Sequence, residues 1–260
     1  VTVHGLVNAT LLPGQKLTGR NGLLAGNGGS VSYRSDSRTD VLRKKNRSLE
    51  DEPQPPRTLH VAATGVVLIR GGASSFGTAL AGGDSGVRVD GLVECTDFHA
   101  GDGGCINGHR VILGPTAVVR ISNGTIGDDG AISGGTLTFE GGLVAAEDIH
   151  VKSSGGVLVG SQVDLRGNAT IIGRNVRAEG GGTVVATTNM TLRDQARIED
   201  HYGWGGGGGA IEMTTLNLYD DSSIFCEESY ADLCGACVSG DIVLTGNASV
   251  VAHNTTAKSQ

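Results

Sequence analysis

The chain has 260 residues, including 44 glycines but only one Trp, four Tyr and four Phe, and its formal net charge is −7. So much glycine disfavours long helices, because each glycine inside a helix costs about 1 kcal/mol relative to alanine. The apolar content of 38% is too high for a disordered glycine-rich linker. An acidic chain without a concentrated basic surface is not expected to bind nucleic acid. The apolar runs fall far short of the ~20 residues that span a bilayer, so no transmembrane segment is expected in this stretch.

Residues 1–27 are predicted to form a partial N-terminal coil of a repeat that becomes regular further along the chain. The segment 17–27 (LTGRNGLLAGN) lines up, residue for residue, with 244–254 (LTGNASVVAHN). Similarity between two such distant segments is the signature of a repeat architecture.

Residues 28–76 are predicted to form one further coil that carries a charged insertion. The coil opens at Gly28, and the apolar positions of the repeat return only after 23 extra residues within 32–57. Those apolar positions are Leu59, Val61 and Val67. The insertion is rich in Ser, Arg, Lys and Pro, and proline is excluded from central strands, so we expect an exposed excursion from the fold.

Residues 77–260 are predicted to form seven regular coils, each opened by small residues followed by an aliphatic or Cys residue. The openings follow one another at intervals of 26, 26, 26, 26, 27 and 26 residues. They start at Gly77, Gly103, Asp129, Gly155, Gly181, Gly208 and Cys234. A fixed register over seven units indicates a solenoid, in which each coil buries its apolar face against its neighbours.

Inside each unit, apolar residues recur at positions 9, 11 and 17, and small residues at position 15. The period of two is typical of strands, and the Gly, Asn, Asp and Pro residues between the pairs are typical of turns. By this count Leu143 is an exception at position 15, and Ala145 occupies position 17. Three short strands with three bends fit in one unit. The predicted fold is therefore all-β: a single-stranded, right-handed parallel β-helix of about nine coils stacked ~4.8 Å apart.

The openings also resemble a known repeat family, the chlamydial polymorphic outer membrane proteins with their G-G-A-I and F-x-x-N motifs. Gly208-Gly-Ala-Ile211 matches the first motif outright. Degenerate forms of the second are Ile172-x-x-Asn175, Val251-x-x-Asn254 and Phe225-x-x-Glu228. The resemblance implies a β-helical passenger domain, similar to pectin-lyase-like solenoids, on the outer cell surface. It implies an adhesive or structural role and no chemistry.

Seven of the asparagines lie in N-x-[ST] sequons. They are Asn8, Asn46, Asn123, Asn168, Asn189, Asn247 and Asn254. One interpretation is N-glycosylation of a secreted protein. The other is that asparagine favours the turns of a solenoid, so that the repeat itself generates part of the excess.

The five cysteines are Cys95, Cys105, Cys226, Cys234 and Cys237. Cys95 and Cys226 share position 19, and each is followed by a cysteine in the opening of the next coil. This recurrence predicts two disulfides across one bend, and hence an oxidising compartment. The rival interpretation of Cys234-x-x-Cys237 is a redox or zinc half-site.

One column of titratable residues is the candidate for catalysis. Position 20 holds Asp148, Arg174, His201, Glu227 and His253, with Asp200 adjoining. Stacked coils would align these residues on one face, as β-helical lyases, epimerases and glycosidases do with their acids and bases. The alternative is a surface ladder in which opposite charges on neighbouring strands stabilise the sheet.

Two smaller features complete the candidate sites. Asp194 and Asp220 share position 13 and could together hold Ca²⁺. The glycine run 205–209 lacks the Lys-Ser/Thr of a phosphate loop, and is interpreted as a bend beside an aromatic contact site of Tyr202 and Trp204. No cofactor is expected.

We therefore expect an extracellular or cell-surface β-helix protein with a structural, adhesive or ligand-display role and no catalysis. Its ligands would be proteins or glycans, and the alternative is a carbohydrate-active β-helix enzyme. The chain starts without Met, and nothing near Gln260 could cover the last coil. We thus expect a longer natural chain and, for this segment, end-to-end self-association through the uncovered strand edge.

Overall fold

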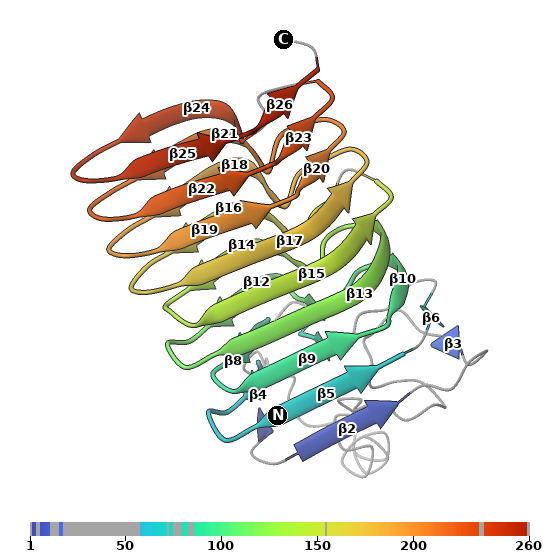
Figure 1. Ribbon diagram of the computed structural model, residues 1–260. Helices are drawn as coiled ribbons and strands as arrows, with labels where there is room; N and C mark the ends of the chain where they lie inside the picture. The colour runs from blue at the N-terminus through green and yellow to red at the C-terminus, as the bar shows by residue number, and fades with distance from the viewer. Residues whose placement is uncertain are drawn as a thin grey trace, which may run out of the picture.

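Two long parallel sheets, wound by one chain, form the rod that Figure 1 shows, with the N- and C-termini at opposite ends. In this computed structural model the described residues are 2–3, 6–10, 16–17, 58–71, 73–74, 80–82, 86–153, 155–233 and 237–258. Within those ranges the elements are all strands, with no helix. Consequently no described helix is long and apolar enough to cross a membrane. The predicted insertion within 32–57 lies outside the described residues.

The first sheet runs along one side of the rod, and its main path contains nine of the described strands. In order they are β1 (Thr2–Val3), β4 (Leu59–Val61), β8 (Val87–Val89), β12 (Arg110–Leu113), β14 (Ile132–Phe139), β16 (Leu158–Leu165), β18 (Val184–Leu192), β21 (Ile211–Leu218) and β24 (Val238–Leu244). Two short strands join it off this path, β7 (Leu80–Ala81) and β11 (Ile106–Asn107).

The second sheet carries the candidate site, and its main path also has nine described strands. They are β2 (Leu6–Thr10), β5 (Val66–Arg70), β9 (Leu92–Thr96), β13 (Val118–Asp128), β15 (Leu143–Val151), β17 (Thr170–Ala178), β19 (Arg197–His201), β22 (Ser223–Glu227) and β25 (Ser249–His253). Beyond a bend, short strands continue it: β3 (Lys16–Leu17), β6 (Ala73–Ser74), β10 (His99–Asp102), β20 (Trp204–Gly205), β23 (Tyr230–Ala231) and β26 (Thr256–Ala257).

Residues one repeat apart stack directly on one another. Ile106 pairs with Ile132, and Leu165 pairs with Leu192, as the repeat predicted. Every strand pairing among the described residues is parallel, so each coil crosses over to start the next one beside its predecessor. The predicted parallel β-helix is confirmed.

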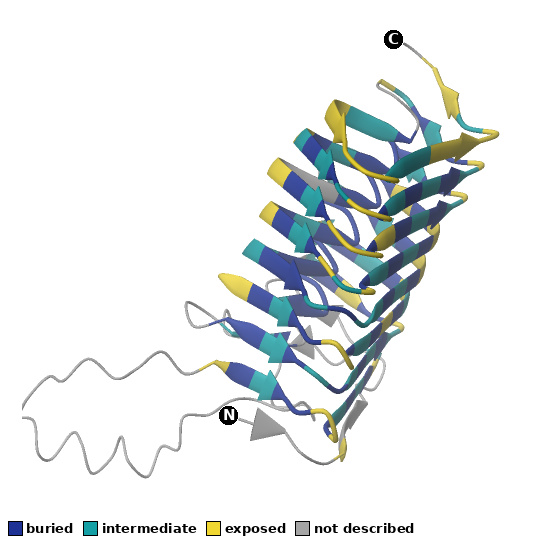
Figure 2. Cartoon of the chain, turned by 90° about the vertical axis from the view of Figure 1, so that its left-hand side faces the viewer, coloured by how far each residue is buried: buried dark blue, intermediate teal, exposed yellow. Residues whose placement is uncertain are grey.

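The interior is filled by columns of aliphatic side chains at the predicted apolar positions. Along the strands, buried residues alternate with half-exposed ones, which Figure 2 shows as repeating bands of colour. Val119, Leu137, Leu165 and Ile198, for example, are fully buried. The period of two thus separates a dry core from an outer surface on which polar side chains line up.

Small residues in the opening motif let successive coils approach each other at one corner. A Cβ atom added at Gly104, Gly156 or Gly182 would overlap a backbone carbonyl oxygen of the next coil. The second glycine of the motif is therefore required by close packing of backbone on backbone. The resemblance to a G-G-A-I repeat has this physical basis here.

One predicted position is corrected by the structure. Val144, not Ala145, lies between Val119 and Ile171 in the interior column, so one step is shorter than the regular repeat and the next is longer. The turn before Val144 is one residue shorter, which Gly141 and Gly142 permit with φ of 148° and 78°. Leu143 accordingly does not break the small-residue rule. It pairs with Val118 on the outer surface.

The two predicted disulfides are present and occupy equivalent places. Cys95 bonds Cys105, and Cys226 bonds Cys237, each linking a β-strand of the second sheet to the opening of the next coil. Cys237 is therefore committed to a disulfide rather than to a metal or a redox pair with Cys234. Cys234 itself lies outside the described residues.

The coil formed by β24 and β25 differs from those before it in exposure. Ile242 and Leu244, whose equivalents in the preceding coils are buried, are 44% and 50% exposed. Figure 2 shows the last strands, at the top of the rod, mostly in the colours of intermediate and exposed residues. End-to-end self-association of this segment through these strands stays a prediction.

Candidate functional site

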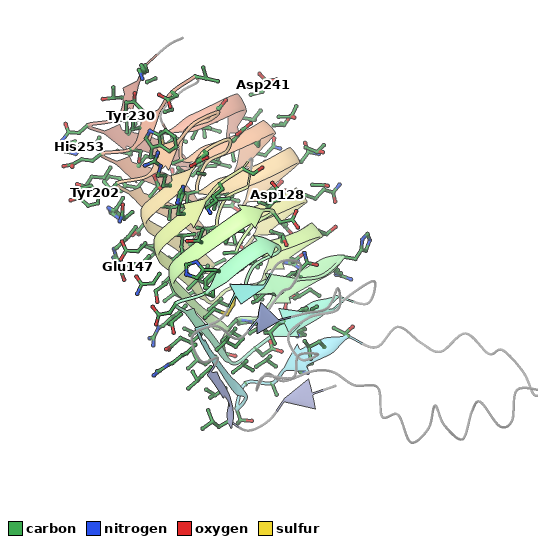
Figure 3. The ribbon with its side chains drawn as sticks, turned by 90° about the vertical axis from the view of Figure 1, so that its right-hand side faces the viewer. Asp128, Glu147, Tyr202, Tyr230, Asp241 and His253 are labelled. Atoms are coloured by element: carbon green, nitrogen blue, oxygen red, sulfur yellow. A yellow bond between two sulfur atoms is a disulfide. The ribbon has the colours of Figure 1, made fainter. Side chains whose placement is uncertain are left out.

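The predicted titratable column exists, with one change of membership. Strand pairing places Glu147, Arg174, His201, Glu227 and His253 next to one another on five successive strands. Asp148 is excluded from the column because the preceding turn is one residue shorter. The column lies on the outer surface of the second sheet, where Figure 3 shows Glu147 and His253 on the same side of the rod.

Asp148 instead lies at the bend that follows the column. It has a positive φ of 55°, and the bend residues of the neighbouring coils, Asn123 and Asn175, have φ of 51°. Asn175 Nδ2 donates to Asp148 Oδ1 at 2.5 Å. Asn and Asp tolerate the left-handed region best among non-glycine residues. This explains the Asn of the degenerate F-x-x-N motif as a backbone requirement of the bend.

His201 is the best-connected member of the column. Its Nδ1 lies 2.9 Å from Glu227 Oε2, and its Nε2 lies 3.7 Å from Glu199 Oε2. On the far side of Glu227, the ring of His253 approaches to 3.9 Å. The His201 ring also packs against Phe225, with centroids 5.8 Å apart. A histidine between two carboxylates is able to exchange protons, and it is equally a cross-strand pair that stabilises a sheet.

Asp200 was predicted beside this column, but its side chain points into the rod. It is 0% exposed and sits in the interior column between Gly173 and Cys226. Burial raises the pKa of its carboxyl group, against the opposing effect of hydrogen bonds from Ser229, Thr183 and the Gly203 N–H. The Ser229 hydroxyl donates to Oδ2 at 2.6 Å, and that of Thr183 donates to Oδ1. The carboxyl group is a satisfied internal group and cannot reach a polymer on the surface.

Three aromatic residues follow the column, one at the bend and two on the short strands beyond it. Tyr202 lies at the bend and is 57% exposed, while Trp204 and Tyr230 pair with each other on β20 and β23. The guanidinium carbon of Arg177 lies 4.5 Å from the centre of the Trp204 ring. In Figure 3, Tyr202 and Tyr230 lie on the same side of the rod as His253. We call Tyr202, Trp204 and Tyr230 the aromatic corner.

Sequence reasoning found Tyr202 and Trp204 but missed Tyr230 and Arg177. The repeat could have predicted the position of Tyr230, because Tyr230 lies one repeat after Trp204 and residues one repeat apart stack on each other. Arg177 lies one repeat before Trp204, across the one longer interval between openings. Extending the column past the bend would therefore have assembled this group.

Asp194 and Asp220 do stack, but their carboxylates serve the backbone. Asp194 Oδ2 accepts the Gly167 N–H at 2.7 Å, and Asp220 Oδ2 accepts the Asp194 N–H at 3.1 Å. Both aspartates have φ of 60°, in line with Gly167 at 64°. Within the ranges that the structure describes, no group of three or more His, Cys, Asp or Glu side chains is arranged to hold a metal ion. The pair is thus a turn ladder, and the Ca²⁺ site stays an untested prediction.

Five of the sequon asparagines are exposed. They are Asn123, Asn168, Asn189, Asn247 and Asn254. Asn8 is described only as part of strand β2, and Asn46 lies outside the described residues. Exposure makes the five accessible to a glycosyltransferase, while Asn123 and Asn254 also occupy the bend that favours asparagine.

The chain matches no family model, no curated protein and no solved structure.

Proposed function

We propose that this chain is a non-catalytic β-helix module of an extracellular or cell-surface protein, which displays its outer columns to protein or glycan ligands. The observation that carries the proposal is that the fold accounts for three of the candidate acids. Asp200 is sealed in the core, Asp148 forms a bend, and Asp194 accepts a backbone N–H. The outer surface of the second sheet then carries regular columns of charged and aromatic side chains on a rigid β-helix.

Two further features support an extracellular location. Disulfides persist in oxidising compartments, and two of them fasten equivalent bends of this rod. Five exposed sequons suit a secreted glycoprotein. The resemblance to surface passenger domains is part of the same proposal. In this chain its glycine positions allow successive coils to pack closely, and its asparagine positions form the left-handed bend.

Labelling of intact source cells tests the proposed location. Antibodies raised against the segment 103–233, which is central in the rod, should stain unpermeabilised cells or the culture medium. The Cys226–Cys237 and Cys95–Cys105 pairs should resist alkylation until a reductant is added. A protein that is stained only after permeabilisation, with its cysteines freely alkylated, would overturn the proposal.

A carbohydrate-active enzyme is the second candidate function. The specific observation in its favour is His201, held between Glu227 and Glu199 on the outer surface. Such a group could act as a general base toward a polysaccharide lying along the sheet. A second His–Glu contact, between His150 and Glu179 at 3.1 Å, lies beyond the bend, where His150 pairs with Arg177, so such contacts also occur outside the column.

A further inference from the structure

We propose that the aromatic corner is a saccharide-binding site, in which sugar rings stack on Tyr202 and Tyr230 and contact the part of Trp204 that Arg177 leaves uncovered. This inference rests on the proposed display function and names its ligand class. Trp and Tyr offer large flat apolar faces with a polar edge, and stacked coils place such faces ~4.8 Å apart. Of the five Tyr and Trp residues in the chain, three form this corner.

Tyr202 is the residue that the fold explains least. Its φ of 59° is in the left-handed region, where the other described coils have Asp, Asn, Glu or Gly. A bulky side chain is rare in that conformation, and such strain persists where the residue serves a function. The ring gains no burial in return, since it is 57% exposed. An exposed aromatic at a strained position is the observation that points to a ligand.

The polar groups around the corner suit a hydroxyl-rich ligand. The Tyr230 hydroxyl donates to Asp232 Oδ1 at 3.2 Å, and Arg177 presents a planar guanidinium over Trp204. Among the described residues, no carboxylate lies within ion-pair distance of Arg177, so its donors are available to ligand oxygens. Aromatic faces beside planar hydrogen-bonding groups match a sugar ring, which has apolar C–H faces and a rim of hydroxyls.

A peptide strand is a poorer occupant of this surface. β20 is hydrogen-bonded to β17 on one side and to β23 on the other, and β23 continues to β26. No strand edge is therefore free at the corner for addition of an extended peptide. An apolar helix would also desolvate the charged groups of Arg177 and Asp232 beside the rings, which makes that occupant unfavourable.

Trp204 is the only tryptophan in the chain, so its fluorescence reports on this site alone. The folded 260-residue protein would be applied to a printed array of neutral, N-acetylated, carboxylated and sulfated oligosaccharides. The strongest binder would then be titrated while Trp204 emission is followed. We expect saturable binding with a change in emission, and roughly tenfold weaker binding for Trp204→Ala on the array.

Tyr202→Asn separates binding from folding. Asparagine suits the left-handed bend, so this variant should melt at the same temperature as the wild type or higher, yet bind the saccharide several-fold more weakly. Tyr219→Ala is the matched control, because Tyr219 stacks with Arg193 at 5.3 Å at a different turn. It should leave saccharide binding unchanged.

The inference is overturned if the array shows no binding above background, or if Trp204→Ala and Tyr202→Asn bind as the wild type does. Either result would leave the proposed surface display standing, because that is tested separately by labelling intact cells. Conversely, a protein found only inside cells that still binds saccharide through Trp204 would overturn the display function and keep the site.

Discussion

Replacing Gly156 by alanine is expected to disrupt the rod more than any single substitution on its surface. The added methyl group would overlap the carbonyl oxygen of Gly182 and crowd that of Thr183 in the next coil. Thr183 O is held in place because Val157 and Leu158 donate their N–H groups to it, and Gly182 precedes it directly in the chain. We expect a loss of about 4 kcal/mol or more of unfolding free energy, the range of severe core substitutions.

Gly135→Ala is the control for this experiment. Gly135 is half-buried, and the nearest atom to an added methyl group would be His109 O at 3.2 Å. Its expected cost is below about 1 kcal/mol, since the alanine also stiffens the unfolded chain. Circular dichroism during urea or thermal denaturation measures both variants. Equal stability of the two would show that the coils are less closely stacked at the opening motif than the structure has them.

The second large effect is expected at Asp200, whose carboxyl group accepts buried hydrogen bonds from Thr183 and Ser229. Asp200→Ala would remove the acceptor of the Thr183 hydroxyl and of the Gly203 N–H, and would leave the Ser229 hydroxyl only the Glu227 carbonyl at 3.4 Å. The expected loss is about 3 kcal/mol, because unpaired buried polar groups keep their full desolvation cost. Asp200→Asn keeps the shape and provides polar atoms that the rotating hydroxyl groups can satisfy, so it should fold as the wild type does.

The pH dependence of the unfolding free energy tests the role of Asp200 more specifically than the stability of the variants at one pH. Burial raises the pKa of Asp200 in the folded protein above the ordinary value of 3.8, so the fold favours the neutral acid. Its contribution to stability is therefore complete below about pH 4, and it is lost as pH rises through the folded pKa. The stability of the wild type relative to Asp200→Asn should fall across that window. A difference that stays constant or rises with pH would contradict the assignment.

The repeat predicted the register of the rod, because a nearly constant spacing in a parallel solenoid leaves few other ways to stack apolar positions. The repeat could not show that the turn at Gly141-Gly142 is one residue shorter than in the other coils. The same coil has one extra residue before its end, so the spacing between openings stays at 26 residues. The shorter turn moved Asp148 out of the charged column. The inward direction of Asp200 was within reach, because position 19 follows the buried position 17 with a period of two and also holds Cys95 and Cys226.

The bend residues were harder to predict, because their role depends on backbone conformation rather than on apolar pattern. Asn123, Asn175 and Asn254 share a left-handed conformation that a sequon explanation alone would not reveal. Tyr202 occupies the same bend position in its own coil. Only the structure shows that this position is left-handed in the described coils, and hence that a tyrosine is unusual there. Function is thus indicated where a residue departs from what the repeat requires.

Incubation with polysaccharides tests the central claim, display without catalysis, most directly. The 260-residue protein would be held for many hours with neutral and acidic polysaccharides, and new reducing ends and unsaturated products would be quantified by mass spectrometry. His201→Ala and Glu227→Gln would be compared with His150→Ala, which breaks a His–Glu contact outside the column. We predict that every polymer is recovered intact with all four proteins. Turnover by the wild type and His150→Ala that is abolished in His201→Ala and Glu227→Gln would contradict the account and establish an enzyme.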